Sequence, residues 1–211
     1  GMTPEIMAIV MLLTGPNSDP IKTFEDNIVW VKGMKGSERR LAFIRGDLNA
    51  TRENPAAYKK HVIPVIEKGD AYTWFHHGLL DVNTGQHGED PNFTEPTFEA
   101  LFESTYGVAP SGDFYDAYKL VKSWRDALQK AFWVNKDNPN KDKLVAALNK
   151  MINDPESVAA IEKKVGKYEW RTGADGDAAV RTLKSFITPE ALKTLADFKR
   201  EQLGYNTVYK E

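Results

Sequence analysis

The sequence contains no cysteine among its 211 residues. Without a thiol, the chain forms no disulfide, no thiolate metal site and no cysteine nucleophile. Long apolar runs are also missing, because the longest covers residues 6–13 and a membrane-spanning helix needs about 20 residues. This run follows Glu5 where a signal peptide would have basic residues, and no small-residue cleavage site follows it. We therefore expect a buried helix there.

Neither sign of charge dominates. The chain has 28 Lys and Arg residues against 30 Asp and Glu residues, which gives a formal net charge of −2. Both signs are scattered, and no segment collects the basic residues that a phosphate-binding surface requires. We therefore expect no nucleic-acid partner. Hydrophobic residues make up 41% of the chain, which is typical of a globular protein that buries a core.

Recognisable catalytic motifs are absent as well. The sequence has no Gly-x-Ser-x-Gly, no His-Glu-x-x-His, no P-loop and no dinucleotide fingerprint. His76 and His77, with His87 nearby, could suggest a metal, but adjacent histidines on a strand point to opposite faces. We expect no enzymatic activity, no metal and no cofactor. One alternative stays open, a small cytoplasmic α/β enzyme that uses Ser37 or the two adjacent histidines.

Helix starts and ends are clearly marked. A residue that can cap a helix precedes proline at several expected helix starts, residues 3–4, 54–55, 138–139, 154–155 and 188–189. Glycines mark helix ends at Gly15, Gly46, Gly69, Gly107, Gly166 and Gly204. We expect helices over residues 3–14, 37–45, 55–68, 97–106, 113–132, 140–153, 155–165, 177–185 and 189–203. The third should bend at Pro64, because proline lacks an amide donor.

Strand-like segments alternate with the early helices. Three short segments rich in apolar and β-forming residues are predicted as strands, at residues 28–31, 48–51 and 71–75. Strand–helix–strand–helix–strand with short links predicts a parallel sheet with right-handed crossovers. The predicted fold is therefore α/β, with a parallel βαβαβ lobe over residues 1–92. A mainly helical region over residues 93–211 packs on the lobe or forms one domain with it, and residues 167–170 are a possible further strand.

The turn before the second helix carries the first candidate ligand site. Lys35, Gly36 and Ser37 lie where free backbone N–H groups, a hydroxyl and the positive helix end favour an anion. The plainer alternative is that Ser37 only caps the helix and the glycine only permits the turn.

A second candidate site follows the second predicted strand. Thr51, Arg52 and Glu53 lie at the edge where open α/β sheets bind ligands. Arg52 could pair bidentately with a ligand carboxylate. Equally, Arg52 and Glu53 could be a solvated ion pair beside an Asn54 helix cap.

Three motifs follow one another along the chain. The first is VWVKGMKGS with LAFIRGDLNA, at residues 29–37 and 41–50. The second is DPNFTEPTFE at residues 90–99, and the third is KLVAALNKMINDP at residues 143–155. In this order they resemble the solute-binding proteins of tripartite tricarboxylate transporters, also called Bug proteins.

This resemblance implies a type II periplasmic-binding-protein-like fold that closes on a small carboxylate. It also implies a periplasmic location, delivery of the ligand to membrane permease subunits, and no catalysis. The chain would correspond to the second lobe and the C-terminal helices of the family, without the first lobe. A further alternative is a protein-interaction module formed by the helical half from Phe98 to Leu203.

Overall fold

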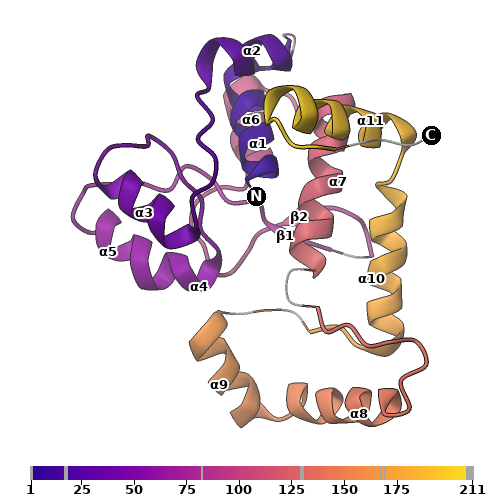
Figure 1. The fold of residues 1–211 in the computed structure, drawn as a ribbon. Helices are drawn as coiled ribbons and strands as arrows, with labels where there is room; N and C mark the ends of the chain where they lie inside the picture. Colours follow the sequence, from indigo (N-terminus) through magenta and orange to yellow (C-terminus); the bar gives the residue numbers. More distant parts are fainter. Residues whose placement is uncertain are drawn as a thin grey trace.

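A computed structural model of the protein describes residues 2–16, 19–81, 83–128, 131–166, 168 and 170–207. The described residues are mainly helical (Figure 1). The helices are α1 (Thr3–Thr14), α2 (Pro20–Asn27), α3 (Gly36–Ile44), α4 (Pro55–Ala57), α5 (Ile63–Ile66), α6 (Phe98–Tyr106), α7 (Asp113–Leu128), α8 (Lys141–Ile152), α9 (Pro155–Val165), α10 (Gly173–Ser185) and α11 (Pro189–Asp197). There are also two π-helical segments, η1 (Tyr58–Val62) and η2 (Phe198–Gln202). The strands are β1 (Leu79–Leu80) and β2 (His87–Gly88).

The predicted buried helix at the start of the chain is α1, and it lies at the centre of the core. Its residues Met7, Ala8 and Val10 are fully buried. α1 packs against α2, α6 and α7, and the core it shares with them also includes Phe198 of η2. Burying a side chain such as Val10 contributes about 1.5–3 kcal/mol. α1 and α7 therefore form the rigid frame on which the other elements are placed.

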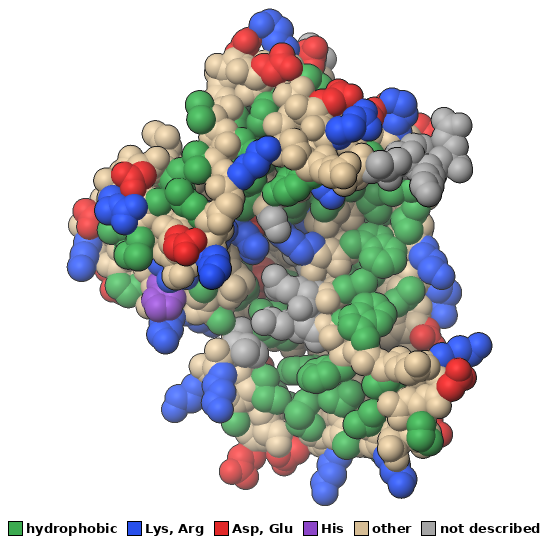
Figure 2. All heavy atoms as spheres, in the orientation of Figure 1, with side chains coloured by type: hydrophobic (Ala, Val, Ile, Leu, Met, Phe, Trp, Pro, Cys, Tyr) green, Lys and Arg blue, Asp and Glu red, His purple; other side chains and the backbone are tan. Residues whose placement is uncertain are grey.

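A smaller apolar cluster joins β1 to α10. Leu80, Ala179 and Leu183 are buried there, with Trp124 of α7 packed against them. The Trp124 indole N–H donates to the carbonyl of Leu183 at 3.1 Å, so this tryptophan is a packing residue with its polar atom satisfied. Below it, α8 and α9 pack on each other, and Figure 2 shows apolar side chains gathered over this part of the surface. α9 also contacts α4.

The predicted α/β fold with a parallel βαβαβ lobe is wrong. The strands found among the described residues are β1 and β2, which pair antiparallel with Leu79 opposite Gly88. His76 and Thr97 add one isolated parallel bridge. None of the segments 28–31, 48–51 and 71–75 is a strand.

Residues 28–31 show the physical reason. Ile28 is extended, with φ −121° and ψ 119°, and it packs with Trp30 against the core, whereas Val29 is 91% exposed. The segment therefore alternates like a half-buried strand, but none of the other described segments supplies the hydrogen bonds of a ladder. Residues 71–75 show the same alternation as residues 28–31, with Phe75 packed against the core and Tyr72 exposed. Near residues 48–51, the Arg39 side chain donates to the Thr51 hydroxyl and to the Arg52 carbonyl.

Most predicted helices are confirmed, with small shifts at their ends. The glycines expected at helix ends all have positive φ. Asn54, Asp154 and Thr188 cap their helices by accepting backbone N–H groups three residues on. Thr3, in contrast, is the first residue of α1 and makes no capping bond, and α10 begins at Gly173, earlier than expected.

Two predictions fall partly on residues outside the described ranges, and a third concerns Pro64. Helix α7 ends at Leu128, before the predicted end at residue 132: positions 129–130 lie outside the described residues, and residues 131–132 are not helical. Half of the possible strand at 167–170, positions 167 and 169, also lies outside the described residues, and residues 168 and 170 are not in a strand. Before Pro64, where a bend was predicted, the helix changes to the π-helical segment η1, and the Ile63 amide donates to the Tyr58 carbonyl five residues back. This π turn directly precedes the proline, which has no amide to donate.

The core crosses the predicted boundary between residues 92 and 93. α1 and α2 from the first region share one apolar cluster with α6, α7 and η2 from the second. The division into two regions stays a prediction. No helix in the described ranges has the length and apolar character needed to cross a membrane.

Candidate functional site

Ionisable side chains follow the inner face of α7, where an ordinary core helix would carry apolar residues. Tyr115, Tyr118, Lys122 and Arg125 recur at helical spacing along this face. The Lys122 side chain is 0% exposed, and Tyr118 is fully buried. Buried charged groups are expensive unless they are paired, so such a network is a candidate for function.

Glu5 of α1 lies at one end of this network. Its Oε1 is 2.5 Å from Nη1 of Arg125, 3.7 Å from Nε2 of His77 and 3.8 Å from Nε of Arg52. Burial would raise the pKa of Glu5, but the His77 ring and the Arg125 and Arg52 guanidinium groups lower it to about 2. Glu5 is therefore ionised at neutral pH and holds three basic side chains from three segments together.

The network continues from His77 toward the surface. Nδ1 of His77 is 2.8 Å from the Tyr118 hydroxyl, and Nζ of Lys122 lies 5.7 Å from the centre of the Tyr118 ring. Lys122 Nζ is in turn 3.6 Å from Oε1 of Glu99, which accepts a hydrogen bond of 3.4 Å from the Tyr115 hydroxyl. Burial beside this carboxylate raises the pKa of Tyr115. The chain of contacts thus reaches α6 from α1.

A cavity of about 420 Å³ opens where the network meets the surface. Charged and polar side chains gather in its wall, and apolar ones from α10 and the loop before α7 complete it. The residues that line it are Gly85, Gln86, His87, Glu99, Glu103, Ala109, Pro110, Tyr115, Lys119 and Phe186. Among these described residues Lys119 carries the positive charge, opposite two glutamates.

His87 in this wall is neutral at physiological pH. Burial and the positive charges of Lys122, His77 and Lys119 lower its pKa to about 2. Its Nε2 lies 3.1 Å from Oγ of Ser123, which is fully buried. The pair resembles a serine–histidine dyad in distance alone, because a buried hydroxyl is closed to substrate and so weak a base takes up protons poorly.

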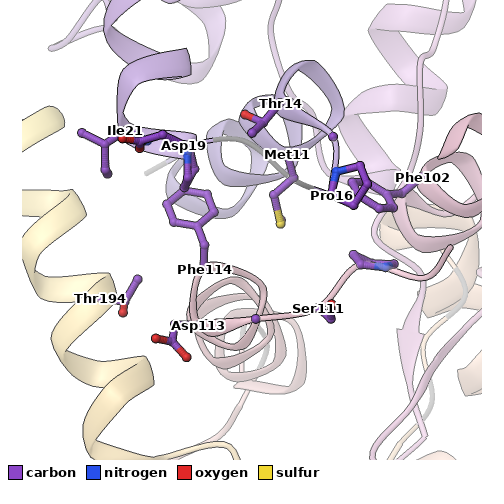
Figure 3. Close-up of a pocket in the computed structure, with 14 residues that line it drawn as sticks. Met11, Thr14, Pro16, Asp19, Ile21, Phe102, Ser111, Asp113, Phe114 and Thr194 are labelled. Carbon is purple, nitrogen blue, oxygen red and sulfur yellow. The ribbon is translucent and has the colours of Figure 1, made fainter.

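A second cavity, of about 370 Å³, lies at the other side of the loop that precedes α7 (Figure 3). Its walls come from the end of α1, the start of α2, α6, the start of α7, and Thr194 of α11. The sulfur of Met11 points into the space between Phe114 on one side and Phe102 and Pro16 on the other. This cavity is mainly apolar and carries no basic residue among the described lining residues.

The first predicted ligand turn lies away from both cavities. Lys35 is the N-cap of α3, and its backbone N–H donates to the Glu38 carboxylate at 2.8 Å. Gly36 begins the helix and Ser37 follows it, both exposed, with no capping bond from a side-chain hydroxyl. The plain helix-cap interpretation of Ser37 is therefore wrong, because the N-cap is Lys35, two residues earlier, and the bond to its backbone N–H comes from Glu38. None of these three residues lines either cavity.

The second predicted set, Thr51, Arg52 and Glu53, makes its polar contacts with other side chains of the protein. The Thr51 hydroxyl and the Arg52 carbonyl both accept from Arg39 at 2.9 Å, and Glu53 accepts from Arg40 at 3.0 Å. Arg52 does face a carboxylate, as its chemistry suggested, but this carboxylate belongs to Glu5. Its role toward a ligand stays a prediction.

The adjacent histidines contact different groups. His76 stacks on Phe93 and lies 3.3 Å from Glu89, whereas His77 faces Glu5 and Tyr118. No cluster of three or more metal-ligating side chains occurs in the described part of the chain.

Sequence reasoning missed the residues of α7 that form the network. The available signal was the spacing of Tyr118, Lys122 and Arg125, which places three long polar side chains on one helical face. The spacing alone does not mark this face as buried, because charged residues are almost never fully buried unless they are paired. The partner Glu5 is 120 positions away from Arg125, so no local pattern shows the pairing.

Comparisons with protein-family models, with curated proteins and with solved structures gave no match.

Proposed function

We propose that the protein binds a small carboxylate outside the cytoplasm, as the solute-binding component of a tripartite tricarboxylate-type transporter, and does not transform it. The ordered motifs at residues 29–50, 90–99 and 143–155 support this proposal. The cavity between β2, α6, α7 and α10 supports it as well, because about 420 Å³ suits a small solute.

The single observation that carries the proposal is the charge pattern of this cavity. Lys119 can receive a carboxylate, since it is a surface-accessible ammonium with 28% of its side chain exposed. Its present partner is Asp116 at 2.8 Å, an exposed pair of small stabilising value that a ligand could replace. The buried Lys122 behind Glu99 adds a second positive charge close to the cavity.

The two glutamates of the cavity wall, Glu99 and Glu103, restrict the kinds of carboxylate that could bind there. Oε2 of Glu99 is buried and accepts no hydrogen bond within the described structure. Glu103 adds a further acceptor to the lining. A simple dicarboxylate would be repelled by these groups, whereas an acid that also carries ammonium or hydroxyl donors would satisfy them. We therefore place amino acids and hydroxy acids ahead of plain dicarboxylates.

Delivery to a permease requires an interaction surface. Large apolar side chains are exposed on α3 and on the extended segments beside it: Val29, Val31, Met34, Leu41, Ile44, Tyr72 and Trp74. A group of exposed apolar residues is typical of a protein–protein contact. Because these residues lie between positions 29 and 74, they would place a contact surface outside the helical half from Phe98 to Leu203, for which the interaction module was predicted.

Calorimetry with a panel of amino acids, hydroxy acids and dicarboxylates tests the proposal. We expect heat of binding for an acid that carries hydrogen-bond donors, and a loss of about tenfold in affinity for Lys119→Gln, as for one lost charge-assisted hydrogen bond. Lys22→Gln is the matched control, because Lys22 also pairs with an aspartate on its own helix but lies outside this cavity. Absence of binding across the panel, or equal losses for the two variants, would contradict the proposal.

A further inference from the structure

The second cavity has a charge pattern opposite to that of a carboxylate site. Of its described lining residues, the charged ones are Asp19, at the start of α2, and Asp113, at the start of α7. The rest are apolar, glycine or hydroxyl-bearing residues. Figure 3 shows the two aspartates on neighbouring elements, with the ring of Phe114 between them. A negatively charged rim over an apolar floor suits a ligand with a positive head and an apolar body.

The negative charge at this rim is not neutralised by nearby lysines. Lys22 of α2 pairs with Asp26 at 2.6 Å, and Lys193 of α11 pairs with Asp197 at 2.6 Å. Asp113 takes part in no ion pair or side-chain hydrogen bond that the described residues provide. Asp19 uses Oδ1 to cap α2, accepting from the amides of Ile21 and Lys22, so its second oxygen stays available.

The floor of the cavity provides contacts for an aromatic or aliphatic body. Met11 and Phe102 line this floor, and at 7% and 3% exposure each leaves only a small apolar surface open to the cavity. The Phe114 ring packs edge-on against Phe198 at a centroid distance of 5.1 Å, which fixes its orientation. Phenyl rings attract cations placed over their faces, and a thioether packs favourably against aromatic groups. The volume of about 370 Å³ is of the size that takes a small organic molecule.

We infer that this cavity, lined by Met11, Phe102 and Phe114 and edged by Asp19 and Asp113, is a binding site for an organic amine with an apolar body. The site is independent of the carboxylate cavity, since Pro110 is the one residue that the two described linings share. The ammonium group lies at the aspartate rim, and the apolar body lies on the phenyl rings and the methionine.

Methyl-labelled NMR of the full chain tests this site with 2-phenylethylamine as the probe. The expected result is a saturable shift of the Met11 and Ile21 methyl signals, while the methyl signal of Met34, which lies outside the cavity, stays in place. Two matched compounds separate charge from shape. The neutral 2-phenylethanol should bind more weakly, and the anionic 3-phenylpropionate should bind most weakly of the three.

Two variants test the role of the rim. Asp113→Asn should weaken amine binding about three- to fivefold, as expected for one lost exposed ion pair, and Asp19→Asn should do the same while keeping the α2 cap, because Asn caps as well as Asp. Asp142→Asn is the control, since Asp142 lies in the first turn of α8 and not in the cavity. Equal binding of the three compounds, no saturable methyl shift, or an equal effect of the control variant would overturn the inference.

Discussion

At the scale of single residues, Glu5 is the side chain on which the buried network depends. It holds Arg125, Arg52 and His77, which come from α7 and from two segments without regular structure. Removing one partner of a buried charge cluster leaves the others uncompensated. The network is therefore vulnerable at this residue.

Glu5→Gln should lower the free energy of unfolding by about 3–5 kcal/mol, as expected for a broken buried ion pair. Urea denaturation followed by circular dichroism measures this. Glu156→Gln in the first turn of α9 is the control and should change stability by less than about 0.5 kcal/mol, because Glu156 is exposed. A Glu5 variant as stable as the control would show that the network contributes nothing.

The ionisation of Glu5 also sets a pH dependence. Its pKa is about 2 in the folded protein and about 4.5 as the unperturbed value, so the unfolded chain binds this proton first. The stabilisation is complete above pH 4.5 and is lost as the pH falls toward 2. Glu5→Gln should remove this part of the acid sensitivity.

His87 makes folding sensitive to pH over a higher range. Its pKa is about 2 when folded, against an unperturbed 6.5, so protonation favours the unfolded state at every pH between these values. Stability should fall by about 1 kcal/mol between pH 6.5 and pH 5.5, because the unfolded chain takes up this proton and the folded protein does not. Urea titrations at pH 6.5 and pH 5.5 should show a smaller drop for His87→Gln than for the unsubstituted protein. Equal drops would mean that folding does not lower the pKa of His87.

At the scale of elements, the caps and helix ends were predictable because they depend on neighbouring residues. Asn54, Asp154 and Thr188 each cap a helix that begins with proline, and each signal lies within four residues of sequence. The strands were not predictable in this way, because a strand also needs a partner that residues 28–31 do not specify. The lysine and tyrosine residues of the cavity wall were missed for the same reason, since Tyr115 and Lys119 of α7 are brought to the same cavity as Glu99 of α6 only by the tertiary structure.

Thr188→Ala tests a cap directly. The Thr188 hydroxyl accepts from the Ala191 amide at 3.1 Å, and α11 packs on α7. We expect a loss of about 1 kcal/mol in unfolding free energy, and little loss for Thr188→Asn, which still caps. Thermal unfolding of both variants measures the difference, and equal losses would argue for a packing role instead.

Val29→Asp tests the correction to the predicted strand. Because Val29 is 91% exposed, an aspartate there should change stability by less than about 0.5 kcal/mol. In a strand covered on both faces, the same change would bury a charge and cost several kcal/mol. Chemical denaturation decides between the two arrangements.

At the scale of the whole molecule, α7 links the core, the buried network and both cavities. It packs on α1 at the centre of the core, carries the buried network along its inner face, and contributes Tyr115 and Lys119 to one cavity and Phe114 to the other. Figure 1 shows α7 between the helices α3–α5 on one side and the helices α10 and α11 on the other. A ligand in either cavity would therefore stabilise the frame of the fold, since binding to the folded state alone raises its stability.

The most direct test of the central claim is an NMR titration of the uniformly labelled protein with the acid that gives the strongest heat of binding. We expect saturable shifts of the side-chain NMR signals of Lys119, His87 and Tyr115, which line the carboxylate cavity. The Lys119→Gln variant should show the shifts of His87 and Tyr115 only at higher ligand concentration. Shifts confined to residues outside this cavity, such as Lys35 to Ser37, would contradict the account and restore the turn before α3 as the binding site.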